Sequence, residues 1–470
     1  MTAHAIRPAP ERPDRSSRAV LALAWRRALC LTGRRRPARE SPWLATARVR
    51  RYAVRDEKTT PSGAFATRQV HAGTAPDPVS GSRAQPIHAT SSFVFHDAAH
   101  AQALFAGAAE GNQYGRMHNP TSDAFAARVA DLEGGVAGVP LASGQAASAA
   151  TLLALASPGA KVVCSTDVFG GTASLFRKWL TPWGVELASV PPDPDAIGAA
   201  LDERTVACWV ETIGNPSGSV PDLPALAERC RDAGVPLVVD NTWGCGGYLC
   251  RPLEHGASVV VHSATKWIGG HGTFVGGVVV DGGTFDWARG PVPALRDARS
   301  PAALAERVHD LGLFTLGATL SPFAAFLGLQ GLETLDLRVQ RSCDTALSLA
   351  RWLDGRGDVQ RVVYPGLPQH PSHAIARRVL RHGFGAVLAL DLAEQDAAHA
   401  FLDRLRLVSH LANIGDAKSV AIHPWTTTHA SMPEGERRAA GVTPGLVRLS
   451  LGLEDEADLR RDLAQALGDA

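Results

Sequence analysis

A single lysine, Lys266, follows a run of β-branched residues in the stretch VVVHSATKWIGGHGT, residues 259–273. Small hydroxyl residues precede it and a glycine-rich turn comes after it. Lysine is costly to bury and usually lies on a solvated surface, whereas a lysine in a partly apolar setting can act as a nucleophile. The residues that follow the other strand-like runs decide between these two interpretations.

Four short apolar runs, AKVVCS, TVACWVE, VPLVVD and ASVVVHS, have the composition of buried β-strands. Phe169 comes after the first run, Asn215 after the second, Asp240 ends the third and Lys266 follows the fourth. Taken singly, these residues have ordinary explanations as a core aromatic, a turn former, a helix cap and a surface lysine. Ligands gather at the carboxyl ends of parallel strands, so the set together predicts one functional site.

A helix start upstream adds an anion site to this set. Ser143-Gly144-Gln145 opens a helical stretch that Pro158-Gly159 closes, and the free N–H groups of a helix start favour a phosphate. Ser263 and Thr265 could add hydroxyl donors to the same anion. A phosphate cradle, a lysine, an acid and an aromatic plate are the parts that pyridoxal phosphate needs. In this hypothesis Lys266 forms the Schiff base, Asp240 keeps the pyridine nitrogen protonated and Phe169 stacks on the ring.

Competing cofactors lack their motifs. The glycine-rich segments match neither GxGxxG after a first strand nor GxxxxGK[ST], so nucleotide binding is not indicated. His262 and His271 flank the lysine, and His410, His423 and His429 come later. None of these histidines has HExxH or Cys/His ligand spacing, so we expect no metal.

The elements that carry these residues alternate between strand-like and helical patterns, which predicts a mainly parallel α/β sheet with helices on its faces. The chain has 470 residues, of which 45% are hydrophobic and 20% charged, enough for two packed domains. Its seven cysteines form no CxxC pair, which favours a reduced, cytoplasmic compartment. Cys164 and Cys208 lie in strand-like runs and are expected to be small buried apolar residues.

The N-terminus differs in composition from the rest of the chain. Residues 1–58 hold fifteen Lys and Arg against five Asp and Glu, so the remainder is acidic although the net charge is +1. The apolar run at residues 19–25 is too short to span a membrane. Three interpretations stay open: a disordered or mis-started extension, an organelle transit segment, or a basic arm for nucleic acid or an anionic surface.

Beyond these patterns, the sequence resembles the Cys/Met-metabolism family of pyridoxal phosphate enzymes from about residue 67 to residue 467. The matching segments include NQYGRMHNPTSDAFAARVADLEGG, ASGQAA, ETIGNP, VDNTW, HSATKWIGGHGT, YPGLPQHPSH, LVSHLANIGDAKS, IHPWTTTH and GVTPGLVRLSLGLED. SHLANIGDAKS with the following IHP and TTH is the more discriminating pair, and it favours the branch that acts on O-acetylhomoserine.

The resemblance implies a role for each matched residue. Lys266 matches the Schiff-base lysine, Asp240 the pyridine-nitrogen partner and Asn215 a residue near the phenolic oxygen and the substrate. The matched phosphate binders are Ser143, Gly144, Gln145, Ser263 and Thr265. Tyr114 and Arg116 match residues that reach the phosphate of the neighbouring subunit's cofactor, and Arg448 matches the arginine that binds the substrate α-carboxylate.

The family also implies an architecture and an assembly. A fold type I transferase is expected, with a basic, disordered extension at 1–62, an arm at 63–125 that contacts the neighbouring subunit, a cofactor domain at 126–318 and a smaller α/β domain at 319–470. The protein is expected to be a homodimer or a dimer of dimers, with small-molecule substrates and without membrane or nucleic-acid partners.

The implied activity is γ-replacement, in which O-acetylhomoserine and sulfide or a thiol give homocysteine and acetate. Cystathionine γ-synthesis, use of O-succinylhomoserine, methionine γ-lysis and a non-catalytic protein that binds through its basic arm remain as alternatives. The sequence departs from the family at Phe169 and His88, where tyrosine is usual, and QRSCDTALSLA replaces a pattern that usually reads RH followed by NA. These departures leave open a rate or a substrate that differs from the family type.

Overall fold

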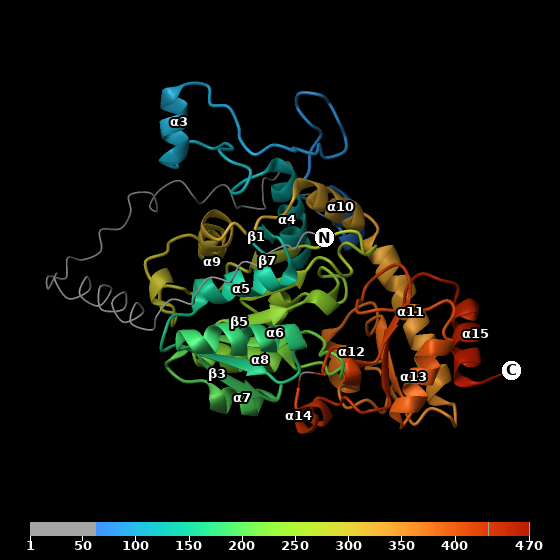
Figure 1. The fold of residues 1–470 in the computed structure, drawn as a ribbon. Coiled ribbons are helices and arrows are strands. Elements are labelled where there is room, and N and C mark those ends of the chain that lie inside the picture. The colour runs from blue at the N-terminus through green and yellow to red at the C-terminus, as the bar shows by residue number, and fades with distance from the viewer. Residues whose placement is uncertain (1–62, 431, 470) are drawn as a thin grey trace, which may run out of the picture. The chain divides into compact units, whose positions relative to one another are not determined.

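The computed structural model describes residues 63–430 and 432–469. The extension predicted at residues 1–62 lies outside these residues. Within them, two β-sheets and their helices organise the chain, and Figure 1 shows the larger sheet with helices on both of its faces.

The larger sheet is mainly parallel, as the strand-like runs predict. Its strands are β1 (Ala137–Leu141), β2 (Lys161–Ser165), β3 (Glu186–Val190), β4 (Thr205–Glu211), β5 (Leu237–Asp240), β6 (Val259–Ser263) and β7 (Gly277–Asp281). They lie in the order β1-β7-β6-β5-β4-β2-β3, and only β7 runs antiparallel to its neighbours. The carboxyl ends of β2, β4, β5 and β6 therefore share one edge.

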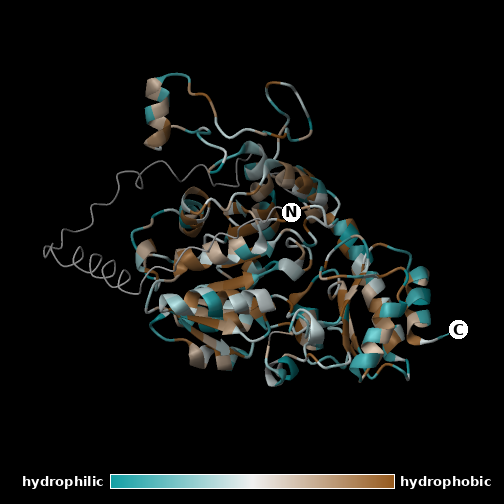
Figure 2. Cartoon of the chain, viewed as in Figure 1, coloured by the Kyte–Doolittle hydropathy of each residue, from teal (hydrophilic) through white to brown (hydrophobic). Residues whose placement is uncertain are grey.

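Helices bury both faces of this sheet, which explains why its central strands read as continuous apolar runs. All seven residues of β4 are buried, and Figure 2 shows the strands as the most hydrophobic part of this layer. One face packs against α5 (Gly144–Leu155), α6 (Gly170–Leu175) and α9 (Ala303–Val308). The other packs against α4 (Pro120–Glu133), α7 (Pro194–Ala200), α8 (Leu223–Asp232) and α10 (Pro322–Leu332).

Helix α5 begins where the sequence predicts it. Ser143 is its N-cap, and the Ser143 hydroxyl accepts a 3.0 Å hydrogen bond from the Ala146 N–H. A Cβ on Gly144 would come within 2.6 Å of the Ser263 Cβ, so only glycine allows this close approach of α5 to β6. The N-terminus of α5 is thereby fixed beside the carboxyl end of β6.

A smaller sheet is formed by the C-terminal part of the chain. Its strands are β8 (Arg361–Val363), β9 (Val387–Asp391), β10 (Ser409–His410), β11 (Val420–Ile422) and β12 (Leu446–Ser450), in the order β10-β11-β12-β9-β8. Its helices are α11 (Leu335–Asp354), α12 (His373–Val379), α13 (Gln395–Arg404), α14 (Glu434–Ala439) and α15 (Glu456–Leu467). α11, α13 and α15 bury an apolar core against this sheet.

The segment before α4 holds the short helices α2 (Phe65–His71) and α3 (Ala98–Phe105). α2 is tied to α4 by a 2.7 Å ion pair between Arg68 and Asp131. Between α2 and α4 the chain is largely exposed, with Val79 94% and Val94 96% accessible. The arm predicted at residues 63–125 includes this segment, and its boundary falls inside α4.

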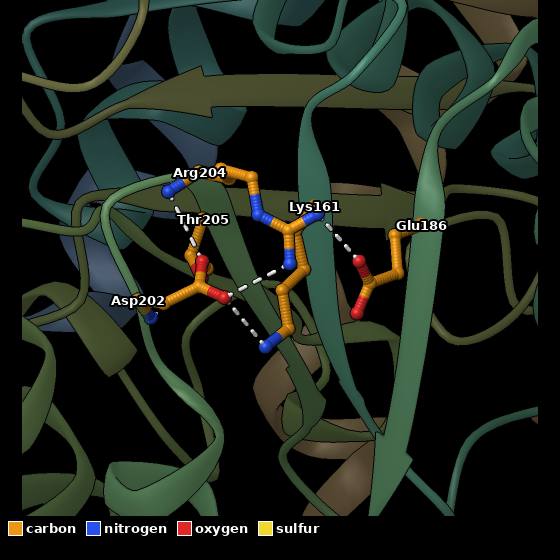
Figure 3. A network of polar contacts seen from close by, with 5 residues as sticks. All are labelled: Lys161, Glu186, Asp202, Arg204 and Thr205. Carbon is orange, nitrogen blue, oxygen red and sulfur yellow. Dashed lines mark hydrogen bonds and ion pairs between the residues drawn. The ribbon is translucent and has the colours of Figure 1, made fainter.

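A charged network occupies the opposite edge of the large sheet, where β2, β3 and β4 begin (Figure 3). Asp202 accepts hydrogen bonds from Lys161 at 3.0 Å, Thr205 at 3.1 Å and Arg204 at 3.3 Å. Arg204 also pairs with Glu186 at 2.8 Å. The amino ends of these strands are thus held by salt bridges, while the carboxyl ends carry the candidate site.

The cysteines that the structure describes are all free and buried, including Cys164 and Cys208 in their strands. This confirms their prediction as buried strand residues. Over the same part of the chain, no helix is both long and apolar enough to cross a membrane.

Candidate active site

A pocket of about 330 Å³ lies at the carboxyl edge of the large sheet, in the range of small-molecule sites. Residues that follow β4, β5 and β6 line it, together with the start of α5 and a loop of the smaller sheet. Ten predicted residues line this pocket: Ser143, Gly144, Gln145, Phe169, Asn215, Asp240, Ser263, Thr265, Lys266 and Arg448.

Lys266 is partly buried just beyond β6. Its Nζ donates a 2.6 Å hydrogen bond to Oδ1 of Asn413. Burial lowers the pKa of Lys266 to about 8, and the positive charge of Arg448 acts in the same direction. A sizeable fraction of this amine is therefore neutral near neutral pH, which a nucleophilic lysine requires.

Asp240 ends β5, and its Oδ1 accepts a 3.0 Å hydrogen bond from the Thr242 N–H. Burial raises the pKa of Asp240, while the hydrogen bonds of Thr242 and the charge of His262 oppose that rise. Glu211, at the end of β4, also lines the pocket and accepts a 2.5 Å hydrogen bond from the Phe169 N–H. Burial and the charge of Asp240 raise the pKa of Glu211 well above its usual value.

The N-terminus of α5 forms one end of the pocket. Gly144 and Gln145 begin this helix, and Ser263 and Thr265 lie next to it across the pocket wall. Free N–H groups of the first helical turn and neighbouring hydroxyls form a site for a phosphate-sized anion. The Thr265 hydroxyl also hydrogen-bonds the backbone of Gly276 at 3.1 Å and 3.3 Å, which fixes its position.

Arg448, in β12 of the smaller sheet, brings a cation to the other end. Its Nη1 donates to Oδ1 of Asn215 at 3.0 Å and its Nη2 to the Asn413 carbonyl at 3.2 Å. The side chain is 5% exposed, and burial lowers its pKa to about 10, so it remains charged at neutral pH. A buried guanidinium with this planar arrangement is suited to bind a carboxylate.

Phe169 precedes α6 and is 43% exposed at the rim of the pocket. A Cβ on Gly171 would come within 2.3 Å of the Phe169 ring and 3.0 Å of the Gln145 amide. Glycine at this position therefore lets the aromatic ring and the amide lie together beside the pocket.

Tyr114 and Arg116 do not line this pocket. The Arg116 guanidinium donates to the Phe314 carbonyl and lies 5.5 Å from the ring centroids of both Tyr114 and Phe314. Tyr114 is 43% exposed. Their predicted role in a neighbouring subunit's site remains a prediction.

Several pocket residues have no individual assignment from the sequence. They are Ser148, Thr172, Glu211, Thr242, Trp243, Val275, Ala412, Asn413, Ile414 and Thr428. Asn413 belongs to SHLANIGDAKS and Thr428 to IHPWTTTH, the two most discriminating matched segments, which is the signal that could have found them. Glu211 is the last residue of the strand-like run TVACWVE, so the sequence pattern indicates only that it belongs to the strand.

Thr428 forms a hydroxyl–imidazole pair with His429, its Oγ1 lying 2.9 Å from Nδ1 of the ring. Burial and the nearby charge of Arg448 lower the pKa of the His429 imidazole below its usual value. A hydrogen bond with the Asn215 backbone opposes this shift without cancelling it. Among the residues that the structure places, His, Cys, Asp and Glu form no group of three or more that could hold a metal ion.

Residues 66–468 match the family described as Cys/Met metabolism PLP-dependent enzyme, where PLP is pyridoxal phosphate. The chain belongs to this family.

The similarity between this Cys/Met metabolism enzyme and its curated relatives extends over nearly the whole length of those relatives. O-acetyl-L-homoserine sulfhydrylase 1 of Thermus thermophilus is 45% identical over 418 residues, which span 86% of this chain and 99% of that protein. Homocysteine synthase of Schizosaccharomyces pombe is 44% identical over 419 residues, covering 86% and 98%. Sulfhydrylase FUB7 of Fusarium oxysporum f. sp. lycopersici is 44% identical over 418 residues, covering 86% and 96%.

Solved structures confirm the fold type I architecture. A Campylobacter jejuni protein assigned as an O-acetylhomoserine (thiol)-lyase superposes with a TM-score of 0.83 at 32% identity, covering 86% of this chain and all of that one. Its structure carries a pyridoxyl-lysine phosphate. Cystathionine gamma synthase of Xanthomonas oryzae pv. oryzae, in complex with aminoacrylate and cysteine, gives a TM-score of 0.78 at 35% identity, covering 87% and 99%.

The pocket of this Cys/Met metabolism enzyme fits pyridoxal phosphate. Gly144 and Gln145 at the start of α5 line the pocket, and the carboxylate of Asp240 and the amine of Lys266 line it too. Pyridoxal phosphate carries an aldehyde, a pyridine nitrogen and a phosphate. These groups need an amine, an acid and an anion-binding site respectively. The enzyme is therefore pyridoxal phosphate-dependent.

Proposed function

We propose that this enzyme catalyses γ-replacement on O-acetylhomoserine, releasing acetate and adding sulfide or a thiol to give homocysteine or its thioether. The C–O bond at Cγ breaks, a C–S bond forms at the same carbon, and hydrogen sulfide or the thiol gives up one proton, which is released with the acetate. The observation that carries the reaction class is the convergence of Lys266, Asp240 and Arg448 on one pocket. The names of the relatives that cover the chain support the choice of substrate.

Arg448 binds the α-carboxylate of the amino acid in this proposal. Its guanidinium is buried and positively charged, and its two bonded groups, the Asn215 amide and the Asn413 carbonyl, are neutral. A substrate carboxylate supplies the negative charge that the buried cation lacks, and a charge-assisted hydrogen bond contributes about 1.5–3 kcal/mol. The amino acid is thereby oriented with its amine toward Lys266.

The cofactor is held at three points. Lys266 would attach it through its amine, Asp240 would accept a hydrogen bond from its protonated pyridine nitrogen, and the start of α5 with Ser263 and Thr265 would bind its phosphate. When bound, pyridoxal phosphate supplies an electron sink for negative charge that develops at the substrate Cα. Phe169, at the pocket rim, would stack on the face of the ring, and Asn215 would be the residue near its phenolic oxygen.

Lys266 also moves protons. The neutral form of its amine would remove the proton from the substrate Cα, because its pKa of about 8 lies close to neutral pH. Asn413 accepts a hydrogen bond from Nζ and keeps the freed amine inside the pocket. The Thr428 hydroxyl, paired with His429, supplies a further polar group on the pocket wall.

The enzyme is proposed to act in the cytoplasm as a homodimer or a dimer of dimers. Exposed apolar residues beside Arg116, namely Phe314 and Leu316 at 51% and 56% accessible, support a contact between copies. In this assembly Tyr114 and Arg116 of one copy reach the phosphate in the other. The proposed divisions are the arm at 63–125, the cofactor domain at 126–318 and the C-terminal domain at 319–470.

To test the proposal, the purified protein is loaded with pyridoxal phosphate and given O-acetylhomoserine and sulfide, and the homocysteine formed is quantified. Lys266→Ala is the control. Homocysteine formed by the wild type and lost in the variant is the expected result. Cofactor binding without homocysteine would retain the family and refute the substrate.

A substrate panel separates the proposal from the other reactions of the family. O-Succinylhomoserine as the acyl donor, cysteine as the nucleophile and methionine alone test the succinyl-dependent, cystathionine-forming and methionine-cleaving reactions. We expect the highest kcat/KM with O-acetylhomoserine and sulfide. A higher value with any of the other combinations would reassign the reaction.

A further inference from the structure

Four fully buried polar residues lie beneath the pocket and have no part in the proposed chemistry. Glu133, Thr212, Asn241 and His262 each have 0% exposed surface, and we call them the Glu133 cluster. Oε1 of Glu133 accepts a 2.7 Å hydrogen bond from Nδ2 of Asn241 and lies 2.7 Å from Nε2 of His262. The Thr212 hydroxyl donates to Oδ1 of Asn241 at 2.5 Å.

Three members of the cluster are chain neighbours of pocket residues. Thr212 follows Glu211 at the end of β4, Asn241 follows Asp240 at the end of β5, and His262 precedes Ser263 in β6. The backbone ladder continues through two of them, since the Thr212 N–H bonds the Asp240 carbonyl at 3.1 Å and the Asn241 N–H bonds the Val261 carbonyl at 2.9 Å.

Alternation along a strand places the cluster on the face opposite to the pocket. Val210 and Val260 pack into the core that also contains α4, whereas Val261 packs into the core on the α5 side. Glu133, the last residue of α4, reaches this opposite face and bonds two of the strand ends directly. The cluster therefore joins three neighbouring strand ends through one helix end.

Stability alone gives a weak reason for these residues. A buried carboxylate and imidazole lose hydration, and replacing such a pair by apolar residues is often neutral or stabilising. Oε2 of Glu133 and Nδ1 of His262 make no hydrogen bond within the described part of the chain, which adds to the cost of the cluster. The hydrogen bonds that the cluster does make still specify geometry, because each fixes a direction as well as a distance.

The cluster also acts on the charge of Asp240. Burial raises the pKa of this carboxyl, while the hydrogen bonds of Thr242 and then the electrostatic interaction with His262 oppose the rise. The other charged or titratable groups that line the pocket are Glu211, Lys266 and Arg448. Asp240 must stay ionised to hold a pyridinium nitrogen, and the interaction with His262 favours its ionised form.

We propose that the Glu133 cluster is a set of positioning residues that holds the ends of β4, β5 and β6 in the alignment with which Asp240 and Ser263 meet the cofactor. This inference rests on the proposed placement of pyridoxal phosphate and is independent of the acyl group and the thiol. It assigns to Glu133 and His262 a role in cofactor binding that neither residue performs by contact.

The test measures binding of pyridoxal phosphate to the full-length protein after removal of the cofactor, together with the visible circular dichroism of the bound form and the melting temperature of the cofactor-free form. Asn241→Leu removes the centre of the cluster at similar volume. Glu133→Gln is the conservative variant, because its Oε1 still accepts both hydrogen bonds. Ser342→Ala is the matched control, since this buried hydroxyl bonds the Gly452 carbonyl in the C-terminal domain, away from the strand ends.

We expect Asn241→Leu to raise the Kd for pyridoxal phosphate at least tenfold and to change the circular dichroism. Glu133→Gln should raise the Kd less than threefold. Ser342→Ala should lower only the melting temperature. Wild-type Kd and circular dichroism in Asn241→Leu, with a lowered melting temperature, would overturn the proposal. If Asn241→Leu does not fold, Thr212→Val decides: a Kd raised several-fold supports the proposal and an unchanged Kd refutes it. Because no homoserine ester or sulfide is used, failure of the proposed reaction leaves this result interpretable.

Discussion

The amine of Lys266 and the amide oxygen of Asn413 are 2.6 Å apart, although 147 residues separate them in the chain. The lysine follows β6 of the large sheet, and the asparagine lies in the loop between β10 and β11 of the smaller one. The same asparagine accepts a hydrogen bond from Arg448 through its carbonyl. The proposed cofactor-binding amine and the proposed carboxylate-binding guanidinium are thus linked by a single residue.

The pKa of Lys266 predicts when the cofactor-free protein takes up pyridoxal phosphate. With a pKa of about 8, the reactive neutral amine increases as the pH rises through 8 and is nearly fully formed above 9. We expect the rate of uptake, followed by absorbance in stopped flow, to rise about tenfold per pH unit below 8 and then to level off. A midpoint near 10.5, the ordinary value for lysine, would contradict a buried amine.

Asn413→Asp changes the charge beside this amine. A carboxylate next to Nζ favours the ammonium form, so the pKa of Lys266 rises and the midpoint of uptake moves to higher pH. At pH 7.5 we expect uptake about tenfold slower than in the wild type, from a shift of about one unit. Lys418→Gln is the control, since Lys418 is exposed on the same loop and pairs with Asp416. Equal midpoints in wild type and Asn413→Asp would refute the contact.

Arg448→Lys keeps the charge and removes the planar pair of donors. We expect kcat/KM for the amino acid to fall about 30- to 150-fold, mainly through a higher KM, because about 2–3 kcal/mol of charge-assisted hydrogen bonding is lost. Uptake of pyridoxal phosphate should stay within about twofold of the wild type. Steady-state kinetics with varied O-acetylhomoserine measure this, and an unchanged KM would remove Arg448 from substrate binding.

Phe169 is expected to contribute stacking and no polar contact. Phe169→Ala should weaken binding of pyridoxal phosphate about tenfold, since an aromatic contact is worth about 0.5–1.5 kcal/mol beyond the apolar area it buries. Phe169→Tyr keeps the ring, and the 43% exposure of the side chain leaves room for a hydroxyl. We expect Phe169→Tyr to bind within about twofold of the wild type by fluorescence titration. Equal affinity of the Ala variant would argue against stacking.

Asp202→Asn tests the charged network at the far edge of the sheet. Burial raises the pKa of Asp202, but hydrogen bonds from Lys161 and Thr205 outweigh it and bring the value to about 2. A depressed carboxyl pKa stabilises the fold above the unfolded value of about 4, and this contribution disappears as the pH falls from 4 to 2. We expect urea unfolding to show a loss of about 1 kcal/mol at pH 7 and a smaller loss at pH 3. Activity should be unchanged, and a large loss of activity would contradict the separation of the two edges.

The strands and the chemistry at their ends could be predicted from the sequence. Buried parallel strands read as apolar runs because helices cover both faces, and the N-cap of α5 is a local pattern of Ser143 and small residues. Asn413 and Thr428 could not be assigned from such patterns, since they reach the pocket only when the smaller sheet docks against the larger one. The sequence names His262 only among histidines without metal-ligand spacing, and its 2.7 Å contact with Glu133, 129 residues away, shows its place.

The division of the pocket between two sheets has a consequence for how such an enzyme can diversify. The strands that hold the proposed phosphate and pyridine sites belong to one sheet, whereas residues 411–419, which carry Asn413, form a short connection in the other. Exchanges in that connection outside Asn413 alter what a bound amino acid meets, whereas Asn413 itself also contacts the cofactor-binding amine of Lys266. New substrates can thus be acquired by changing one surface-derived loop, without rebuilding the catalytic framework.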